Sequence, residues 1–143
     1  MAISYDDVVN AQKTQDNIIR KTSLTFSDTF TKITGSTVYL KNEFEQKTGS
    51  FKLRGAYYKI KTLSEEEKRN GVVAASAGNH AQGVAFASAL EKIKCVIVMP
   101  KNASPAKIAA TKAYGATVVL AGKNYDESWI KAQGIAKTTG ATI

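Results

Sequence analysis

The chain has 143 residues, a length that suits one domain with a hydrophobic core. Hydrophobic residues make up 43% and charged residues 22%, which is typical of a soluble globular protein. No segment has the apolar length of a membrane span, and the start lacks the basic end and apolar core of a signal peptide. We therefore expect a cytoplasmic protein without a membrane partner.

The net charge of +8 requires nucleic-acid binding to be considered, because a basic domain attracts polyanions. The basic residues are scattered, however, and acids such as Glu43, Glu45 and the run at 65–67 interrupt them. No helix-turn-helix, zinc finger or aromatic-basic motif accompanies the charge. We predict no dedicated nucleic-acid partner and interpret most of the charges as solvated surface.

The first part of the chain predicts helices and one short strand. Ser4 can cap a first helix, whose early acids suit the positive field at a helix start. Residues 38–41 have the pattern of a short strand. Residues 51–60 have the pattern of a helix, which is followed by a capping box at 64–67.

From residue 72 onward, strand-like and helix-like segments alternate. We predict strands at 72–75, 95–99 and 117–120, helices at 79–89, 105–113 and 126–138, and the first residues of a further strand at 141–143. Strands joined through helices form right-handed βαβ units, and these build a parallel sheet covered on both faces. The predicted fold class is therefore α/β.

Cys95 and Trp129 are interpreted as core residues. A single cysteine cannot form an intrachain disulfide, and the apolar run around Cys95 is typical of a buried strand. Trp129, together with Tyr125 and Ile130, fits the core-facing stripe of the last helix. We expect these side chains to contribute packing and not chemistry.

The first motif that points to chemistry is TGSFK at residues 48–52. A lysine is by default a solvated surface charge. Lys52 differs because it lies at the start of a predicted helix, where the helix dipole favours an uncharged amine, as a nucleophilic lysine requires.

The second motif is SAGNH at residues 76–80, between the strand at 72–75 and the next helix. Free N–H groups at that helix start point to the carboxyl end of the strand, which makes an anion site. Gly78 lets the backbone approach a ligand closely. Alone, this loop would be an ordinary helix start, and its combination with the lysine motif favours a binding site.

The two motifs, in this order and with a strand between them, resemble those of fold-type II pyridoxal-phosphate enzymes, most closely the threonine dehydratases (threonine ammonia-lyases) and serine racemases. The resemblance covers essentially the whole chain and the amino-terminal half of such an enzyme. It implies a truncated three-layer fold of the tryptophan synthase β type. Residues 1–45 would belong to the large domain and residues 46–143 would form the small domain, with the glycine-rich loop for the cofactor phosphate beyond residue 143.

The resemblance also implies roles for individual residues. The catalytic residue would be Lys52, which would form the Schiff base with pyridoxal phosphate. Phe51 would pack beside the cofactor ring, and Asn79 would donate to its 3′-oxygen. The residues expected to hold the substrate carboxylate are Ser76, Gly78, Asn79 and His80. No metal is expected, because His80 is the only histidine and no set of zinc ligands has suitable spacing.

The implied activity is dehydration of L-threonine or L-serine, which gives 2-oxobutanoate and ammonia from threonine, in a homo-oligomer of full-length chains. Racemases of the family usually carry a serine at the position of Ala77, where it serves as a second base. Alanine cannot do so, which favours dehydration over the alternatives of a serine racemase or a β-replacement enzyme. A non-catalytic folded fragment is the alternative of another class. Without the phosphate loop, we expect the 143 residues alone to be inactive.

Overall fold

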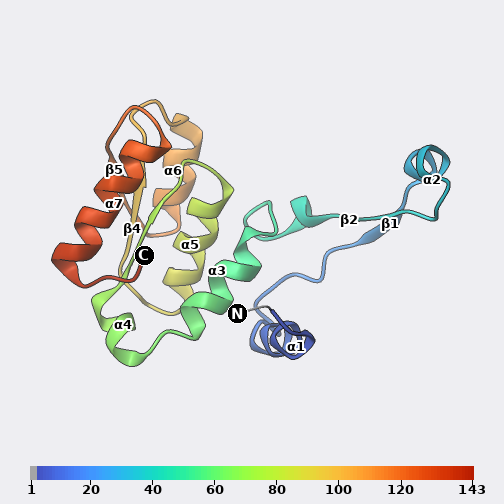
Figure 1. The fold of residues 1–143 in the computed structure, drawn as a ribbon, viewed down its shortest axis with the longest axis horizontal. Helices are drawn as coiled ribbons and strands as arrows, with labels where there is room; N and C mark the ends of the chain where they lie inside the picture. Colours follow the sequence, from blue (N-terminus) through green and yellow to red (C-terminus); the bar gives the residue numbers. More distant parts are fainter. Residues whose placement is uncertain (1–2) are drawn as a thin grey trace.

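A parallel sheet lies at the centre of the computed structural model, which describes residues 3–143 (Figure 1). Its strands are β3 (Val72–Ala75), β4 (Cys95–Met99) and β5 (Thr117–Leu120), in the spatial order β3-β4-β5. Thr142 forms a parallel bridge with Val72 and so extends the sheet beyond β3. The predicted strands and their parallel arrangement are confirmed.

Helices surround the sheet and precede it along the chain. They are α1 (Tyr5–Thr14), α2 (Asp28–Thr34), α3 (Lys52–Lys61), α4 (Glu65–Asn70), α5 (Asn79–Leu90), α6 (Pro105–Ala113) and α7 (Tyr125–Thr139), with a short 3-10 turn at Glu43–Glu45. Ser4 and Ser64 cap α1 and α4 through the predicted capping interactions. Within residues 3–143, no helix combines the length and the apolar character that crossing a membrane requires.

Two hydrophobic clusters, one on each face of the sheet, make the body a three-layer α/β structure. Helices α3, α5 and α6 cover the first face, where Leu53, Ile97 and Met99 are fully buried. Helix α7 covers the second face, where Ala132 packs against Val98. Side chains of β4 alternate between the two clusters, as successive residues of a strand must.

The predicted burial in the core is confirmed for Cys95 but only partly for the residues of α7. Cys95 is buried, and this burial raises the pKa of its thiol to about 11, so it is confirmed as a packing residue. Trp129 is half-buried in the second cluster, but Tyr125 is 57% and Ile130 is 66% exposed. The prediction for these two residues was wrong, because α7 meets the sheet through a narrow stripe that includes Ala132.

An arm extends from the body and carries α2 and two short strands (Figure 1). Strand β2 (Tyr39–Lys41) confirms the strand predicted at 38–41, but it pairs antiparallel with β1 (Leu24–Phe26) in a separate sheet. Neither β1 nor α2 was predicted. Helix α2 has no buried residue, so it has no core-facing apolar stripe that would mark it in the sequence. Large apolar side chains are exposed along this arm: Leu24, Phe26, Phe30, Ile33, Tyr39 and Leu40.

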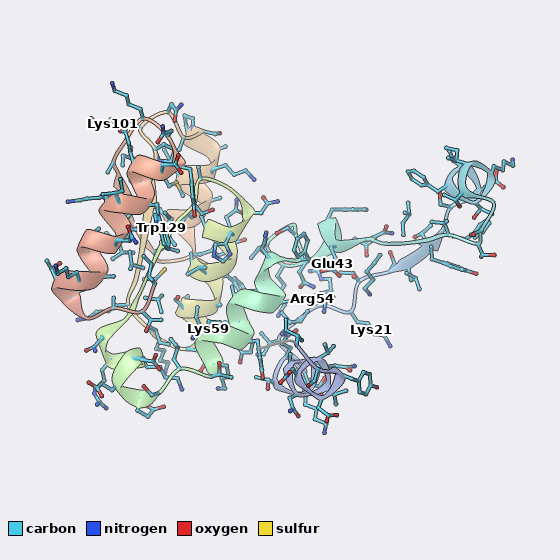
Figure 2. All side chains as sticks on the ribbon, viewed as in Figure 1. Lys21, Glu43, Arg54, Lys59, Lys101 and Trp129 are labelled. Atoms are coloured by element: carbon cyan, nitrogen blue, oxygen red, sulfur yellow. The ribbon has the colours of Figure 1, made fainter. Side chains whose placement is uncertain are left out.

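A polar network joins the arm to α3. Figure 2 shows Glu43 and Arg54 where the arm meets the body, and the Arg54 guanidinium donates to both carboxylate oxygens of Glu43 at 2.7 and 2.9 Å. The Thr22 hydroxyl donates to the same carboxylate at 2.7 Å. The hydrogen bond with Arg54 holds the pKa of Glu43 below its ordinary value. This network fixes the first turn of α3, which begins with Lys52.

Candidate active site

Lys52 is the first residue of α3, as predicted. A tight turn precedes it, in which the N–H of Gly49 donates to the carbonyl of Gln46 at 2.7 Å and Gly49 has φ +70°. A side chain at this backbone angle would be strained, so glycine suits the turn. The Lys52 side chain is exposed, and its Nζ lies 5.0 Å from the centre of the Phe51 ring, which is itself 57% exposed.

The loop at 76–78 joins β3 to α5, also as predicted. The N–H of Ser76 donates to the carbonyl of Val98, and the Ser76 hydroxyl accepts from the N–H groups of Gly78 and Ala81. Gly78 precedes α5 and offers no side-chain cap. Among the described residues, the N–H groups of Asn79 and His80 have no hydrogen-bond partner, and these two remain available to an anion.

Gly83 brings the two motifs together. A Cβ atom at this position would lie 3.2 Å from the carbonyl carbon of Lys52 and 3.2 Å from the nitrogen of Leu53. Glycine inside a helix costs about 1 kcal/mol relative to alanine, so helix formation does not favour glycine at position 83. The absence of a side chain lets the backbone at the start of α3 rest directly on α5, one turn beyond Asn79.

His80 reports how close the two motifs are. Loss of solvent around the imidazole lowers the pKa of His80, and the positive charge of Lys52 lowers it further. Together with the contact between Gly83 and the Lys52 backbone, this effect puts the start of α3 close to the start of α5. The lowered pKa favours the uncharged form of the His80 ring.

We expect the pKa of His80 to lie below its ordinary value of 6.5 in the cofactor-free protein, and Lys52→Met to raise it by removing the nearby charge. Since the unfolded chain binds this proton at higher pH, folding stability falls as the pH drops through about 6.5. The measurement is an NMR titration of the only imidazole. Lys131→Met, an exposed lysine on α7 at the opposite face of the sheet, is the matched control, and an equal effect of both variants would contradict the proximity of Lys52 and His80.

A hollow between α1 and α3 is separate from this site. A cavity of about 1000 Å³ between α1 and α3 is lined by residues that include Gln15, Arg54 and Tyr58, but not by Lys52 or the 76–78 loop. The candidate site is instead an open surface at the carboxyl edge of the sheet, the place where ligands of parallel α/β sheets bind.

Two residues of this site, Gly83 and Lys107, were given no role from the sequence, although Gly83 ends the stretch 76–83 that carries the second motif. Gly83 carried a usable signal, because a glycine inside a predicted helix often marks a close backbone approach. Lys107 had no such signal in the sequence, because its contact with Asn79 spans 28 residues. The Lys107 Nζ donates to the Asn79 side-chain oxygen at 2.9 Å.

An exposed lysine, two free N–H groups at a helix start and an amide side chain thus lie at the starts of the neighbouring helices α3 and α5. Comparison of the sequence with known families agrees with this geometry: residues 16–143 match the family described as pyridoxal-phosphate dependent enzyme. The chain belongs to this family, and the predicted fold-type II class and cofactor are confirmed.

Among curated proteins, the chain is similar to threonine ammonia-lyases and threonine dehydratases. The chain is 50% identical to an L-threonine ammonia-lyase of Thermotoga maritima and 47% identical to the catabolic L-threonine dehydratase TdcB of Staphylococcus aureus. The alignments cover 99% of this chain but 35% and 41% of these relatives. The chain therefore spans well under half of the length of the curated relatives it matches.

Solved structures of similar fold also extend well beyond the part that this chain matches. Maize serine racemase superposes with a TM-score of 0.91 at 32% identity, covering 99% of this chain and 43% of that one. The processed threonine deaminase isoform 2 of Solanum lycopersicum superposes with a TM-score of 0.84 at 35% identity, covering 99% and 43%.

The residues present fit the reactive end of pyridoxal phosphate. The Lys52 amine can bond to its aldehyde carbon, and the Asn79 amide can donate to a ring oxygen. The free N–H groups at the start of α5 suit a carboxylate. A glycine-rich run for the phosphate group does not occur in the 143 residues.

Proposed function

We propose that the complete product of this gene is a threonine dehydratase, which converts L-threonine to 2-oxobutanoate and ammonia, and L-serine to pyruvate. The observation that carries the proposal is the placement of Lys52 against α5 by Gly83, beside the 76–78 loop. The printed names of the relatives that are 47–50% identical support the same substrate.

Lys52 has two tasks in this proposal. Its amine would hold the cofactor at the aldehyde carbon, and the free amine would take the proton from the substrate α-carbon. Pyridoxal phosphate, when bound, supplies a conjugated ring that accepts the electron pair. The α-proton would pass to Lys52 and the β-hydroxyl would leave, so that the substrate loses one water. Hydrolysis of the remaining carbon–nitrogen bond would take up one water and give the 2-oxoacid and ammonia.

The neighbouring residues bind and orient. Ser76, Gly78, Asn79 and His80 would hold the substrate carboxylate, and the Asn79 side chain would donate to the cofactor 3′-oxygen. Phe51 would cover one side of the ring, and its exposed position supports this use. An uncharged His80 would bind as a hydrogen-bond donor without adding a cation beside Lys52.

Several further expectations remain proposals. They are the division into residues 1–45 and 46–143, a homo-oligomeric assembly and a cytoplasmic location. The inactivity of the 143 residues alone is also a proposal. It is supported by the exposed apolar side chains of the arm and by the open, water-accessible position of Lys52.

The test is chemical labelling combined with an assay. The complete gene product is incubated with pyridoxal phosphate, reduced with borohydride and digested, and the labelled peptide is identified. We expect label on Lys52 and formation of 2-oxobutanoate from L-threonine. Label on Lys41, Lys47 or Lys59 would refute the assignment, and labelled protein that leaves threonine unchanged would refute the substrate.

Racemisation is the second candidate, favoured by the similarity to maize serine racemase. It requires a second acid–base group on the opposite face of the substrate, and the methyl side chain of Ala77 cannot act in this way. We expect the unmodified enzyme to turn L-serine into pyruvate with little D-serine, and Ala77→Ser to increase the share of D-serine. The products are measured by chiral chromatography, and abundant D-serine from the unmodified enzyme would contradict this reading.

A further inference from the structure

Lys107 reaches from α6 to the start of α5. Its Nζ lies 2.9 Å from the side-chain oxygen of Asn79. Strands β3 and β4 are parallel neighbours, so the loops that follow them open at the same edge of the sheet. Helices α5 and α6 begin after these loops, which is why the first residue of α5 and the first turn of α6 meet.

This contact sets the direction of the Asn79 amide. An amide has an oxygen that only accepts and a nitrogen that only donates, whereas a lysine ammonium only donates. Lys107 therefore selects the orientation in which the oxygen of Asn79 faces α6 and the NH₂ group faces away. Within residues 3–143, the hydrogen bond from Lys107 is the one made by this side chain, so both amide hydrogens stay available.

We propose that Lys107 is a positioning residue, which holds the Asn79 amide with its NH₂ group directed to the 3′-oxygen of pyridoxal phosphate. This inference rests on the proposed function, in which Asn79 makes that contact. Without Lys107 the amide can turn over, and its oxygen then faces the 3′-oxygen of the cofactor. Two acceptors in contact would weaken binding and favour a protonated 3′-oxygen.

The test is a double-mutant cycle on the complete gene product. Lys107→Met should weaken pyridoxal phosphate binding about three- to tenfold, the equivalent of one net hydrogen bond. It should also move the pH titration of the bound cofactor's visible absorbance to higher pH. Lys107→Arg, which keeps a cationic donor, should restore much of both values. Lys112→Met is the matched control on an exposed lysine of the same helix.

The decisive comparison is made in an Asn79→Ala background. If Lys107 acts through the amide, Lys107→Met has no further effect on binding or on the spectrum there. Equal effects in both backgrounds would show a general electrostatic role and overturn the proposal. If Asn79→Ala shifts the spectrum and Lys107→Met does not, the proposal fails while the proposed function stands. If Asn79→Ala also leaves the spectrum unchanged, the role of Asn79 fails, and this inference fails with it.

Discussion

Lys52→Ala should abolish covalent attachment of pyridoxal phosphate and lower kcat for L-threonine by at least about 10³-fold, because the variant loses the amine that would also remove the α-proton. The fold should survive, since the Lys52 side chain is exposed and has no hydrogen-bond partner within residues 3–143. Substitutions of this kind change stability by about 0.5 kcal/mol or less. The measurements are the visible spectrum of the bound cofactor, steady-state turnover and thermal unfolding.

Lys59→Ala is the matched control for this variant. Lys59 is an exposed lysine on the same helix, two turns further along, and it should keep both the cofactor spectrum and the turnover. Added methylamine should restore part of the activity of Lys52→Ala, because an external amine can take the place of the missing base. Full activity of Lys52→Ala would show that another residue carries the chemistry.

Gly83→Ala should lower stability and activity together. Alanine favours a helix by about 1 kcal/mol, but the new methyl group would press on the backbone of Lys52 and Leu53, and overpacking of this kind costs about 1–3 kcal/mol. The contacted atoms are backbone atoms, which cannot change rotamer as a side chain can, so the start of α3 must move. We expect a several-fold loss of kcat, because Lys52 moves with it.

Gly134→Ala supplies the comparison. Gly134 also lies inside a helix, α7, and a Cβ atom there would meet nothing within 4 Å. This variant should gain stability from helix propensity and keep full activity, while Gly83→Ala should unfold at a lower temperature than the unmodified protein. Thermal unfolding and kcat measured on both variants test the idea. If Gly83→Ala were stabilised as much as Gly134→Ala, the contact between α3 and α5 would not constrain Lys52.

Local sequence pattern was enough for the sheet and its helices. The strands at 72–75, 95–99 and 117–120 are short apolar runs bounded by turn residues, and the helices between them have clear starts at Asn79 and Pro105. Such signals depend on neighbours in the chain, so they can be read without a structure. The order of the lysine and loop motifs likewise identified the family before any contact was known.

Contacts between distant residues were decided only by the tertiary structure. The pairing of β1 with β2 and the exposure of Tyr125 and Ile130 depend on which surfaces meet, and a single periodic pattern does not contain that information. The same holds for the two contacts that shape the site. Gly83 touches the backbone of Lys52 from another helix, and Lys107 reaches Asn79 because parallel neighbouring strands open at one edge. The sequence by itself identified Lys52 and the 76–78 loop as candidate site residues. Their proximity in space is determined by the packing of α5 against α3 and α6.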